Sequence, residues 1–305
     1  MHFDPLIAIT GDNCEVNKSI GRKMEVPLVG CASHRFNLAV NLILASRKNV
    51  LDKVHHLMGK FKNLKFGAKL RKYTMLSPIQ RNATRWSSTA EMVKRYFELK
   101  QFVMHFGNCA ELLDFFPTPR ENVELEELSE TMKMLDSVTK ALQGDVDLSD
   151  VRALFDEIIS KIPETGHYLG QDANIVANPV FEKAIMKLQD DSPNELNEEE
   201  KQAVAYLFTV NFEAEDQQQS ADTDTDFARS IIKKRKMTMP VKKYESCKFI
   251  LPTSDLVERF FSSAGYALSD LRNRLLPSNL ELQLFLKVNK RFWDKKTVQN
   301  AMNIE

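Results

Sequence analysis

The strongest structural signal in this chain is Leu251-Pro-Thr-Ser-Asp-Leu-Val-Glu-Arg-Phe-Phe-Ser-Ser-Ala-Gly265. Ser254 is a residue type that commonly precedes a helix. Apolar side chains then recur at helical spacing: Leu256, Val257, Phe260, Phe261 and Ala264. Glu258 lies on the same predicted helix. A carboxylate on a mostly apolar surface is expected to be functional or paired, because burying it unpaired costs free energy.

A second helical pattern follows and closes the chain. Pro277 interrupts the sequence, and Ser278 with Glu281 three residues later predicts a capping box that opens a last helix. This helix carries two apolar stripes, Leu280, Leu284, Val288 and Phe292 on one side and Leu282, Leu286 and Trp293 roughly opposite. Both stripes must be buried, one against the chain's own domain and the other against a further surface. That surface is either a partner subunit or the interior of a single domain.

Length and composition narrow the class of protein. The 305-residue chain can form one large or two ordinary domains. Its apolar runs are shorter than the ~18–20 residues of a membrane span, and its first residues do not form a signal-peptide pattern. Four scattered cysteines without a CxxC pair encode neither a disulfide framework nor a zinc finger. We therefore expect an intracellular protein with no membrane partner and no small-molecule substrate.

The net charge of zero hides a strong segregation of charge along the chain. Residues 60–100 contain eleven Lys and Arg against two Glu, whereas residues 111–226 contain 28 acids against 8 bases. From residue 229 onward, 16 bases again outnumber 7 acids. A basic segment favours contact with polyanions, so 60–100 is predicted to bind nucleic acid. The alternative is a set of solvated helix faces.

The order of secondary-structure elements indicates an α+β protein that is mostly helical. Apolar runs predict strands at 5–10 and 26–31, with a short polar helix between them. A long helix is predicted from Ser33 to Ser77-Pro78, with a break near Gly67, and another helix follows Trp86. Residues 110–212 show several helical segments with acidic faces and no strand pattern.

Composition also predicts the domain organisation. Residues 213–226 contain no apolar residue larger than alanine, which is typical of a solvated linker. The cluster Lys233-Lys-Arg-Lys236 directly after it resembles a nuclear localisation signal. The predicted parts are 1–107, an acidic all-α insertion at 108–212, a disordered linker at 213–246, and a C-terminal region at 247–305.

Several short motifs carry polar residues that are suited to chemistry. They are, in chain order, Thr10-Gly-Asp-Asn13 after the first strand, Cys31-Ala-Ser-His34 after the second, Thr84-Arg-Trp-Ser87, and Val257-Glu-Arg-Phe-Phe-Ser262. Together, and in this order, they resemble motifs of the hAT superfamily of DNA transposases. The resemblance implies an incomplete RNase H-like fold, which is interrupted by a large helical insertion and followed by C-terminal dimerisation helices.

The resemblance also implies roles for individual residues. Asp12 and Glu258 would be carboxylate ligands of a catalytic Mg²⁺ or Mn²⁺, and His34 would support the active site. Arg85 and Trp86 would contact DNA, with the indole stacking on a base beside the cut. Structural roles stay open, with Trp86 as a core anchor and His34 as a residue that bonds the backbone at a helix N-terminus.

Two surfaces follow from the same interpretation. Within the basic segment, Lys65, Lys69 and Lys72 are predicted to contact the DNA backbone. In the C-terminal region, the implied dimer contacts are Phe260, Leu282, Leu286 and Trp293. The predicted partners are therefore a second copy of the chain and DNA.

One carboxylate of the family's set has no counterpart in this chain. Family members carry an earlier aspartate on the first strand of the fold, and the chain begins shortly before Asp12. Asp4 would lie on the same strand as Asp12 and cannot replace a residue from a neighbouring strand. We expect no catalysis, because two-metal chemistry needs the complete set, and Mg²⁺ or Mn²⁺ is the expected cofactor only if that set is completed. The missing strands are also expected to leave a bare sheet edge.

Three functions are consistent with these observations. The first is a transposase-derived nuclear protein that dimerises through its C-terminal region and binds DNA without cleaving it. The second is an active cut-and-join transposase, if a longer chain or a partner supplies the missing aspartate. The third is a helical scaffold that binds other proteins through its acidic middle. We favour the first, because the dimerisation segment is intact whereas the carboxylate set is not.

Overall fold

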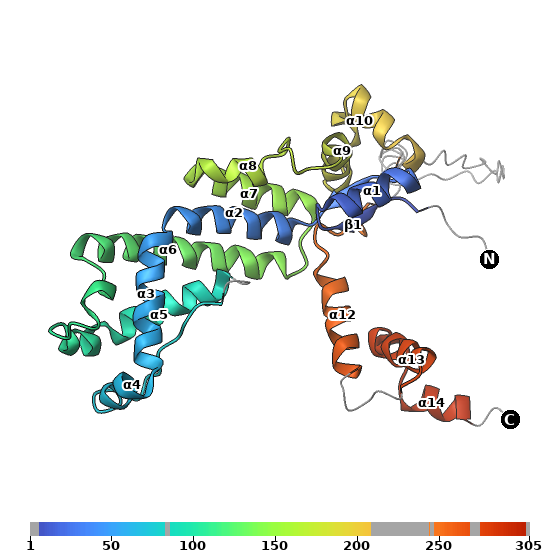
Figure 1. Ribbon diagram of the computed structural model, residues 1–305. Coiled ribbons are helices and arrows are strands. Elements are labelled where there is room, and N and C mark those ends of the chain that lie inside the picture. The colour runs from blue at the N-terminus through green and yellow to red at the C-terminus, as the bar shows by residue number, and fades with distance from the viewer. Residues whose placement is uncertain (1–5, 83–85, 209–243, 245–246, 269–274, 303–305) are drawn as a thin grey trace, which may run out of the picture. The chain divides into compact units, whose positions relative to one another are not determined.

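The computed structural model describes residues 6–82, 86–208, 244, 247–268 and 275–302. The chain divides into two compact units, Met1–Pro252 and Thr253–Glu305. Helices dominate, and the described residues contain one small sheet of two parallel strands (Figure 1). The predicted α+β class with predominantly α-helical content is therefore confirmed at this level.

The sheet is formed by the two predicted strands. Strand β1 (Ile9–Gly11) pairs in parallel with β2 (Leu28–Gly30), so that the first and last residues of the two strands lie side by side. The polar helix α1 (Glu15–Met24) connects them. Glu25 follows the helix as its C-cap, and its φ of 56° places it in the left-handed conformation. Because the strands are parallel, their carboxyl ends meet at one edge of the sheet.

The long helix predicted from Ser33 is three helices: α2 (Ala32–Ser46), α3 (Lys48–Lys62) and α4 (Leu64–Leu70). The breaks fall at Arg47 and at Asn63, whose extended backbone cannot continue a helix. They have a packing cause, because α2 packs against α6 (Pro119–Leu142) and α8 (Gly166–Leu169), whereas α3 packs against α4 and α5 (Trp86–Val103). Figure 1 shows α3 turning sharply away from α2.

The break that was predicted near Gly67 falls four residues earlier, at Asn63, and Gly67 itself lies inside α4. A Cβ at Gly67 would stand 2.9 Å from the carbonyl oxygen of Phe61. Glycine is therefore required for the close approach of α4 to the end of α3, not for ending a helix. The helix itself ends at Leu70, before the predicted stop at Ser77-Pro78.

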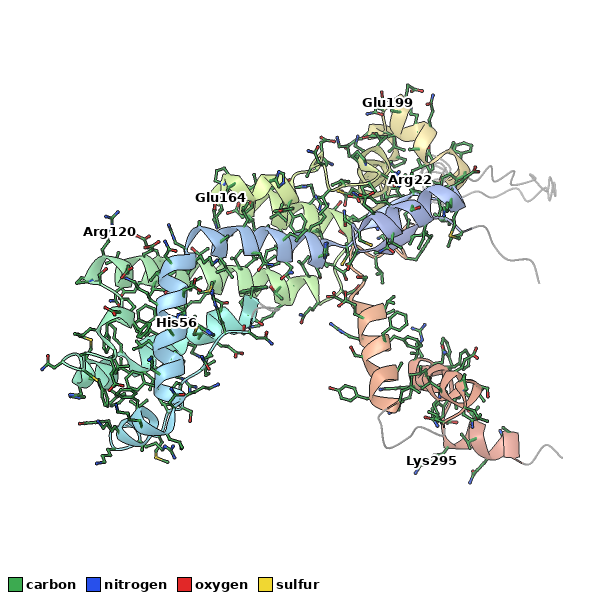
Figure 2. All side chains as sticks on the ribbon, viewed as in Figure 1. Arg22, His56, Arg120, Glu164, Glu199 and Lys295 are labelled. Atoms are coloured by element: carbon green, nitrogen blue, oxygen red, sulfur yellow. The ribbon has the colours of Figure 1, made fainter. Side chains whose placement is uncertain are left out.

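One hydrophobic core joins the helices before and after residue 107. The helix predicted after Trp86 is α5 (Trp86–Val103), which begins at Trp86 itself. It packs against α3 and against α6 (Pro119–Leu142), and α7 (Leu148–Lys161) completes the cluster. Figure 2 shows the side chains that fill the space between these helices. The predicted parts 1–107 and 108–212 therefore share one core.

A second, smaller cluster surrounds strand β2. It is built from α9 (Pro179–Gln189) and from side chains near α10 (Glu198–Ala203). Cys247 and Ile250 also belong to it, so the packing of the first unit continues beyond the predicted boundary at 247.

The described residues of the first unit also form short 3₁₀ helices, at Met104–Phe106, Leu113–Phe115, Pro163–Thr165, Pro193–Glu195 and Ala205–Leu207.

The described residues of the C-terminal unit form α12 (Asp255–Ala267), α13 (Pro277–Val288), a 3₁₀ turn at Lys290–Phe292 and α14 (Lys295–Met302). Ser254 occupies the N-cap position of α12, as predicted. Its hydroxyl donates to the carboxylate of Glu258 at 3.3 Å.

Two predictions about the last helix were wrong. Helix α13 begins at Pro277 and not after Ser278, because proline fits the first turn, where its missing N–H has no partner to bond. The helix also ends at Val288, so Phe292 and Trp293 lie beyond it. The indole N–H of Trp293 donates to the carbonyl of Leu286 at 2.8 Å, which ties the following segment back to α13.

Candidate functional site

The carboxyl edge of the sheet brings two predicted site residues together. Asp12 directly follows β1, and His34 lies in the first turn of α2, which directly follows β2. Nδ1 of His34 is 3.8 Å from Oδ1 of Asp12, and both side chains are partly exposed. In parallel α/β units this edge is where ligands commonly bind. The first unit therefore brings Asp12 and His34 close together, and their roles in a site stay predictions.

Hydrogen bonds fix the backbone around Asp12. The Asn17 side chain donates to the Asp12 carbonyl at 3.0 Å, and the backbone N–H of Cys31 donates to the Gly11 carbonyl at 2.7 Å. The buried Asn13 side chain donates to the Ile175 carbonyl at 2.8 Å. The Asp12 carboxylate thus projects from a rigid turn.

A buried ion pair, which the sequence analysis did not predict, contacts the end of β2 next to this edge. Glu182 on α9 accepts a hydrogen bond from the backbone N–H of Gly30 at 3.0 Å, and its other oxygen is 3.6 Å from the Arg35 guanidinium. Arg35 also donates to the carbonyls of Tyr168 and Gly170, at 3.0 and 2.8 Å. These contacts join the end of β2, the start of α2, helix α9 and the α8 region.

Burial shapes the electrostatics of this pair. Burial raises the pKa of the Glu182 carboxyl, and this effect outweighs the Gly30 N–H and the Arg35 charge, which both lower it. Burial also lowers the pKa of the Arg35 guanidinium.

A signal in the sequence could have located the arginine. Arg35 falls on the same helical face as Ala32 and Ala39, which are buried, and a charge among small apolar residues is expected to have a partner. No such signal marked Glu182, which lies in a segment rich in acids.

The metal site that the resemblance implies is not assembled within one unit. Glu258 lies on α12 of the C-terminal unit, whereas Asp12 belongs to the first unit. Among the described residues, no three His, Cys, Asp or Glu side chains form a group that could hold a metal ion. Mg²⁺ prefers several oxygen ligands, and Asp12 supplies one carboxylate beside the nitrogen of His34. The role of these residues in metal binding stays a prediction.

Trp86 lies at the start of α5 and belongs to the hydrophobic core, with 8% of its surface exposed. Its exposed edge lines a pocket of 430 Å³ together with Arg81 and His55. Burial, aided by the charge of Arg81, lowers the pKa of His55. The observed role of the indole is core packing, and its stacking on a base stays a prediction. Arg85 lies outside the described residues.

The basic segment 60–100 separates into two parts. In its second half, most cations are matched by neighbouring acids: Arg81 with Asp52, Arg95 with Glu98 and Lys100 with Glu126. The first half gathers at the end of α3, on α4 and directly after α4, and we call it the lysine corner: Lys60, Lys62, Lys65, Lys69, Arg71 and Lys72. Among the described residues, only Lys65 of this set makes a salt bridge, with Glu111.

The position of Glu111 shows that several of these cations converge. The pKa of the Glu111 carboxyl is lowered by its hydrogen bond to Lys65 and by the charges of Lys65, Lys60 and Lys69. Lys62, Lys69 and Lys72 are exposed to solvent. The lysine corner therefore offers a concentrated positive charge, part of which is neutralised by one carboxylate.

The C-terminal unit exposes most of its large apolar side chains. Leu284 is buried against its neighbours, but the side chains of Leu282 and Leu286 are 59% and 46% exposed. Phe260 and Trp293 are partly exposed. We call the exposed set the C-terminal apolar surface: Leu256, Val257, Phe261, Tyr266, Leu268, Leu276, Leu282, Phe285, Leu286, Val288, Phe292 and Val298. In the predicted stripe Leu280, Leu284, Val288 and Phe292, Leu284 is therefore buried, whereas Val288 and Phe292 are exposed.

Comparison of the sequence with models of known protein families and with curated proteins gave no match. None of the helices that the structure describes combines the length and apolar character that crossing a bilayer requires. The assignment of function therefore rests on the residues and their geometry.

Proposed function

We propose that this chain is a transposase-derived protein that self-associates through its C-terminal unit and binds DNA through the lysine corner. The observation that carries the proposal is the C-terminal apolar surface, in which twelve large apolar side chains are exposed among the described residues of one small unit. Soluble monomers rarely expose large apolar patches, whereas the interfaces of homodimers are rich in apolar side chains. The order of the hAT-like motifs supports a second copy as the partner.

Self-association is expected to weaken about a hundredfold when Leu282 and Leu286 are both changed to Asp, since two interface anchors commonly contribute more than 2 kcal/mol together. Both side chains are exposed in the isolated chain, so the fold of the unit should be retained. Trp293 is left intact because its indole bonds α13. Sedimentation velocity over a range of concentrations measures the change.

The matched control for this experiment introduces two carboxylates away from α13. Gln299 and Asn300 are both exposed on α14, and changing both to Asp leaves Leu282 and Leu286 unchanged. The control should associate like the wild type. A wild-type protein that is already monomeric at tens of micromolar would contradict the proposal.

DNA binding is expected to depend on the unpaired cations of the lysine corner. Changing Lys62, Lys69 and Lys72 to Glu should weaken binding to duplex DNA and reduce the slope of log K against log salt by about 3, at roughly 0.9 per phosphate contact. Glu111→Gln should have the opposite effect, because it frees Lys65 from its salt bridge. Fluorescence anisotropy with labelled DNA at several salt concentrations measures both.

The control for DNA binding reverses three lysines elsewhere. Lys133, Lys140 and Lys161 are exposed, and each is paired with an acid within one helical turn. Their change to Glu alters the net charge equally and should leave the salt slope close to the wild-type value. Equal losses in both triple variants would show that only net charge, and not the lysine corner, drives binding.

Catalysis is not part of this proposal. Asp12 and Glu258 are two carboxylates of a set in which the resemblance implies three, and in-line phosphoryl transfer by two metals needs both oxygens of the reaction held at once. The alternative, an active transposase, requires a further aspartate from a longer chain or a partner. Nuclear localisation also belongs to the proposal, and the basic cluster at 233–236 lies outside the described residues.

A further inference from the structure

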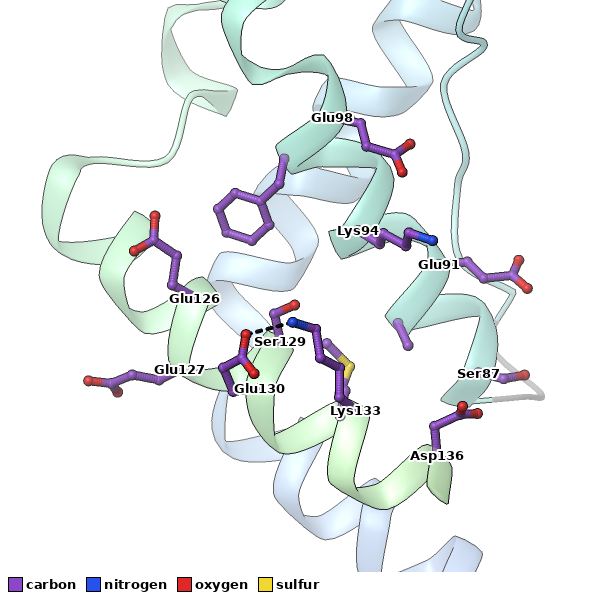
Figure 3. A pocket seen from close by; sticks show the side chains of 13 residues that line it. Ser87, Glu91, Lys94, Glu98, Glu126, Glu127, Ser129, Glu130, Lys133 and Asp136 are labelled. Atoms are coloured by element: carbon purple, nitrogen blue, oxygen red, sulfur yellow. Dashed lines mark hydrogen bonds and ion pairs between the residues drawn. The ribbon is translucent and has the colours of Figure 1, made fainter. Parts of the chain in front are cut away.

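A groove of 990 Å³ runs between α5 and α6 in the first unit. Figure 3 shows side chains from both helices along its two sides, with Glu91 and Lys94 on α5 and Glu127 and Glu130 on α6. The lining on α5 extends from Ser87 to Glu98, which corresponds to about 17 Å of helix. This length matches about three turns of a further helix lying along the groove.

The floor of the groove is apolar. Ala90 and Phe97 from α5 and Met132 from α6 line it, and they continue into the main hydrophobic core of the unit. Met132 is 3% exposed, whereas Phe97 and Ala90 are only partly buried. Two packed helices with such a floor offer the seat that a third helix occupies in a helical bundle.

The rim of the groove carries acids on both helices. Six carboxylates line it, namely Glu91, Glu98, Glu126, Glu127, Glu130 and Asp136, against two lysines, Lys94 and Lys133. Four of the six have basic partners: Glu98 pairs with Arg95, Glu126 with Lys100, Glu130 with Lys133 and Asp136 with Lys140. The other two acids are Glu91 on α5 and Glu127 on α6, and neither makes a salt bridge with any described residue. Negative charge on both sides of an apolar floor selects against nucleic acid and favours a cationic ligand.

We propose that this groove binds an amphipathic helix of a partner protein, with apolar side chains on one face and Lys or Arg along its flanks. The apolar face would cover Ala90, Phe97 and Met132, while the flanking cations would meet Glu91 and Glu127. A helix in a groove is a recurrent mode of peptide recognition, and its anchors recur at i, i+3, i+4 and i+7. This protein-binding site shares no residue with the lysine corner or with the C-terminal apolar surface.

The test uses a fluorescein-labelled 18-residue helical peptide with leucines on one face and lysines on both flanks. Binding to the full chain is measured by fluorescence anisotropy. Changing Glu91 and Glu127 to Lys should weaken the binding by about tenfold, since two favourable charge contacts become repulsive. The same variant should bind the matching peptide with glutamates in place of lysines more tightly than the wild type does. This charge exchange separates a specific groove from general attraction.

The control variant changes Glu164 and Glu199 to Lys, two exposed acids that Figure 2 labels on other elements of the first unit. It should bind the lysine peptide like the wild type. Equal weakening in both variants would overturn the proposal, as would the absence of saturable binding to the wild type at 100 micromolar peptide, a concentration far above the micromolar range of modest complexes. Sedimentation velocity gives one further contradicting outcome. If the variant with Glu91 and Glu127 changed to Lys forms a smaller oligomer than the wild type, the occupant of the groove is a second copy of the chain and not a partner protein.

Discussion

Replacing Glu182 with leucine is expected to lower the free energy of unfolding of the first unit by about 3–5 kcal/mol, which is the usual effect of breaking a buried ion pair. Two groups lose their partner in this variant. The backbone N–H of Gly30 loses its acceptor, and the Arg35 guanidinium remains buried without its counter-charge. Gly30 is the last residue of β2 and pairs with Gly11, the residue before Asp12. Losing the bond between the Gly30 N–H and Glu182 is therefore also expected to loosen the segment that positions Asp12.

Urea denaturation followed by circular dichroism measures this effect, with the double variant Arg35→Met, Glu182→Leu as the informative comparison. The double variant leaves no buried charge unpaired, so it should be more stable than Glu182→Leu alone. Glu182→Gln is the matched control, since its amide oxygen can still accept from Gly30 and it should lose less. A Glu182→Leu protein as stable as the wild type would show that the pair is not a buried support for this edge.

Replacing Trp86 with alanine is expected to destabilise the same unit by about 3–5 kcal/mol, since truncating a buried tryptophan leaves a large cavity. The indole is 8% exposed and packs in the main core at the start of α5. Trp86→Phe should recover much of the stability, because the smaller ring still fills part of the site. Thermal and urea unfolding of the three proteins measure the difference.

The same variants distinguish core packing from base stacking. If Trp86 stacks on an unpaired base, Trp86→Phe should keep most of the affinity for single-stranded or mismatched DNA, because every aromatic face can stack. Trp86→Ala at a temperature where it is folded should then lose about 1–3 kcal/mol of binding free energy. Unchanged stability combined with lost DNA binding would contradict the core role and support the stacking role that the resemblance implies.

Local sequence signals located many elements correctly, and the reason is visible in each. Strands β1 and β2 are short apolar runs bounded by turn residues, and α5 begins at the tryptophan from which its pattern starts. The N-cap position of Ser254 follows from the preference of serine for helix starts. Local signals did not place the helix breaks at Arg47 and Asn63, because neither position carries a glycine or proline.

The sequence by itself determined the predominantly helical class, the two strands, and the segregation of basic and acidic segments, because these depend on periodicity and on residue type alone. Tertiary structure decided which charges are free and which are paired. Lys65 and Glu111 are 46 positions apart, and Arg35 and Glu182 are even more widely separated, so no local pattern could show that they meet. It also decided that the acids of α6 face α5 across an apolar groove, since helix packing, and not spacing along the chain, sets which faces remain open.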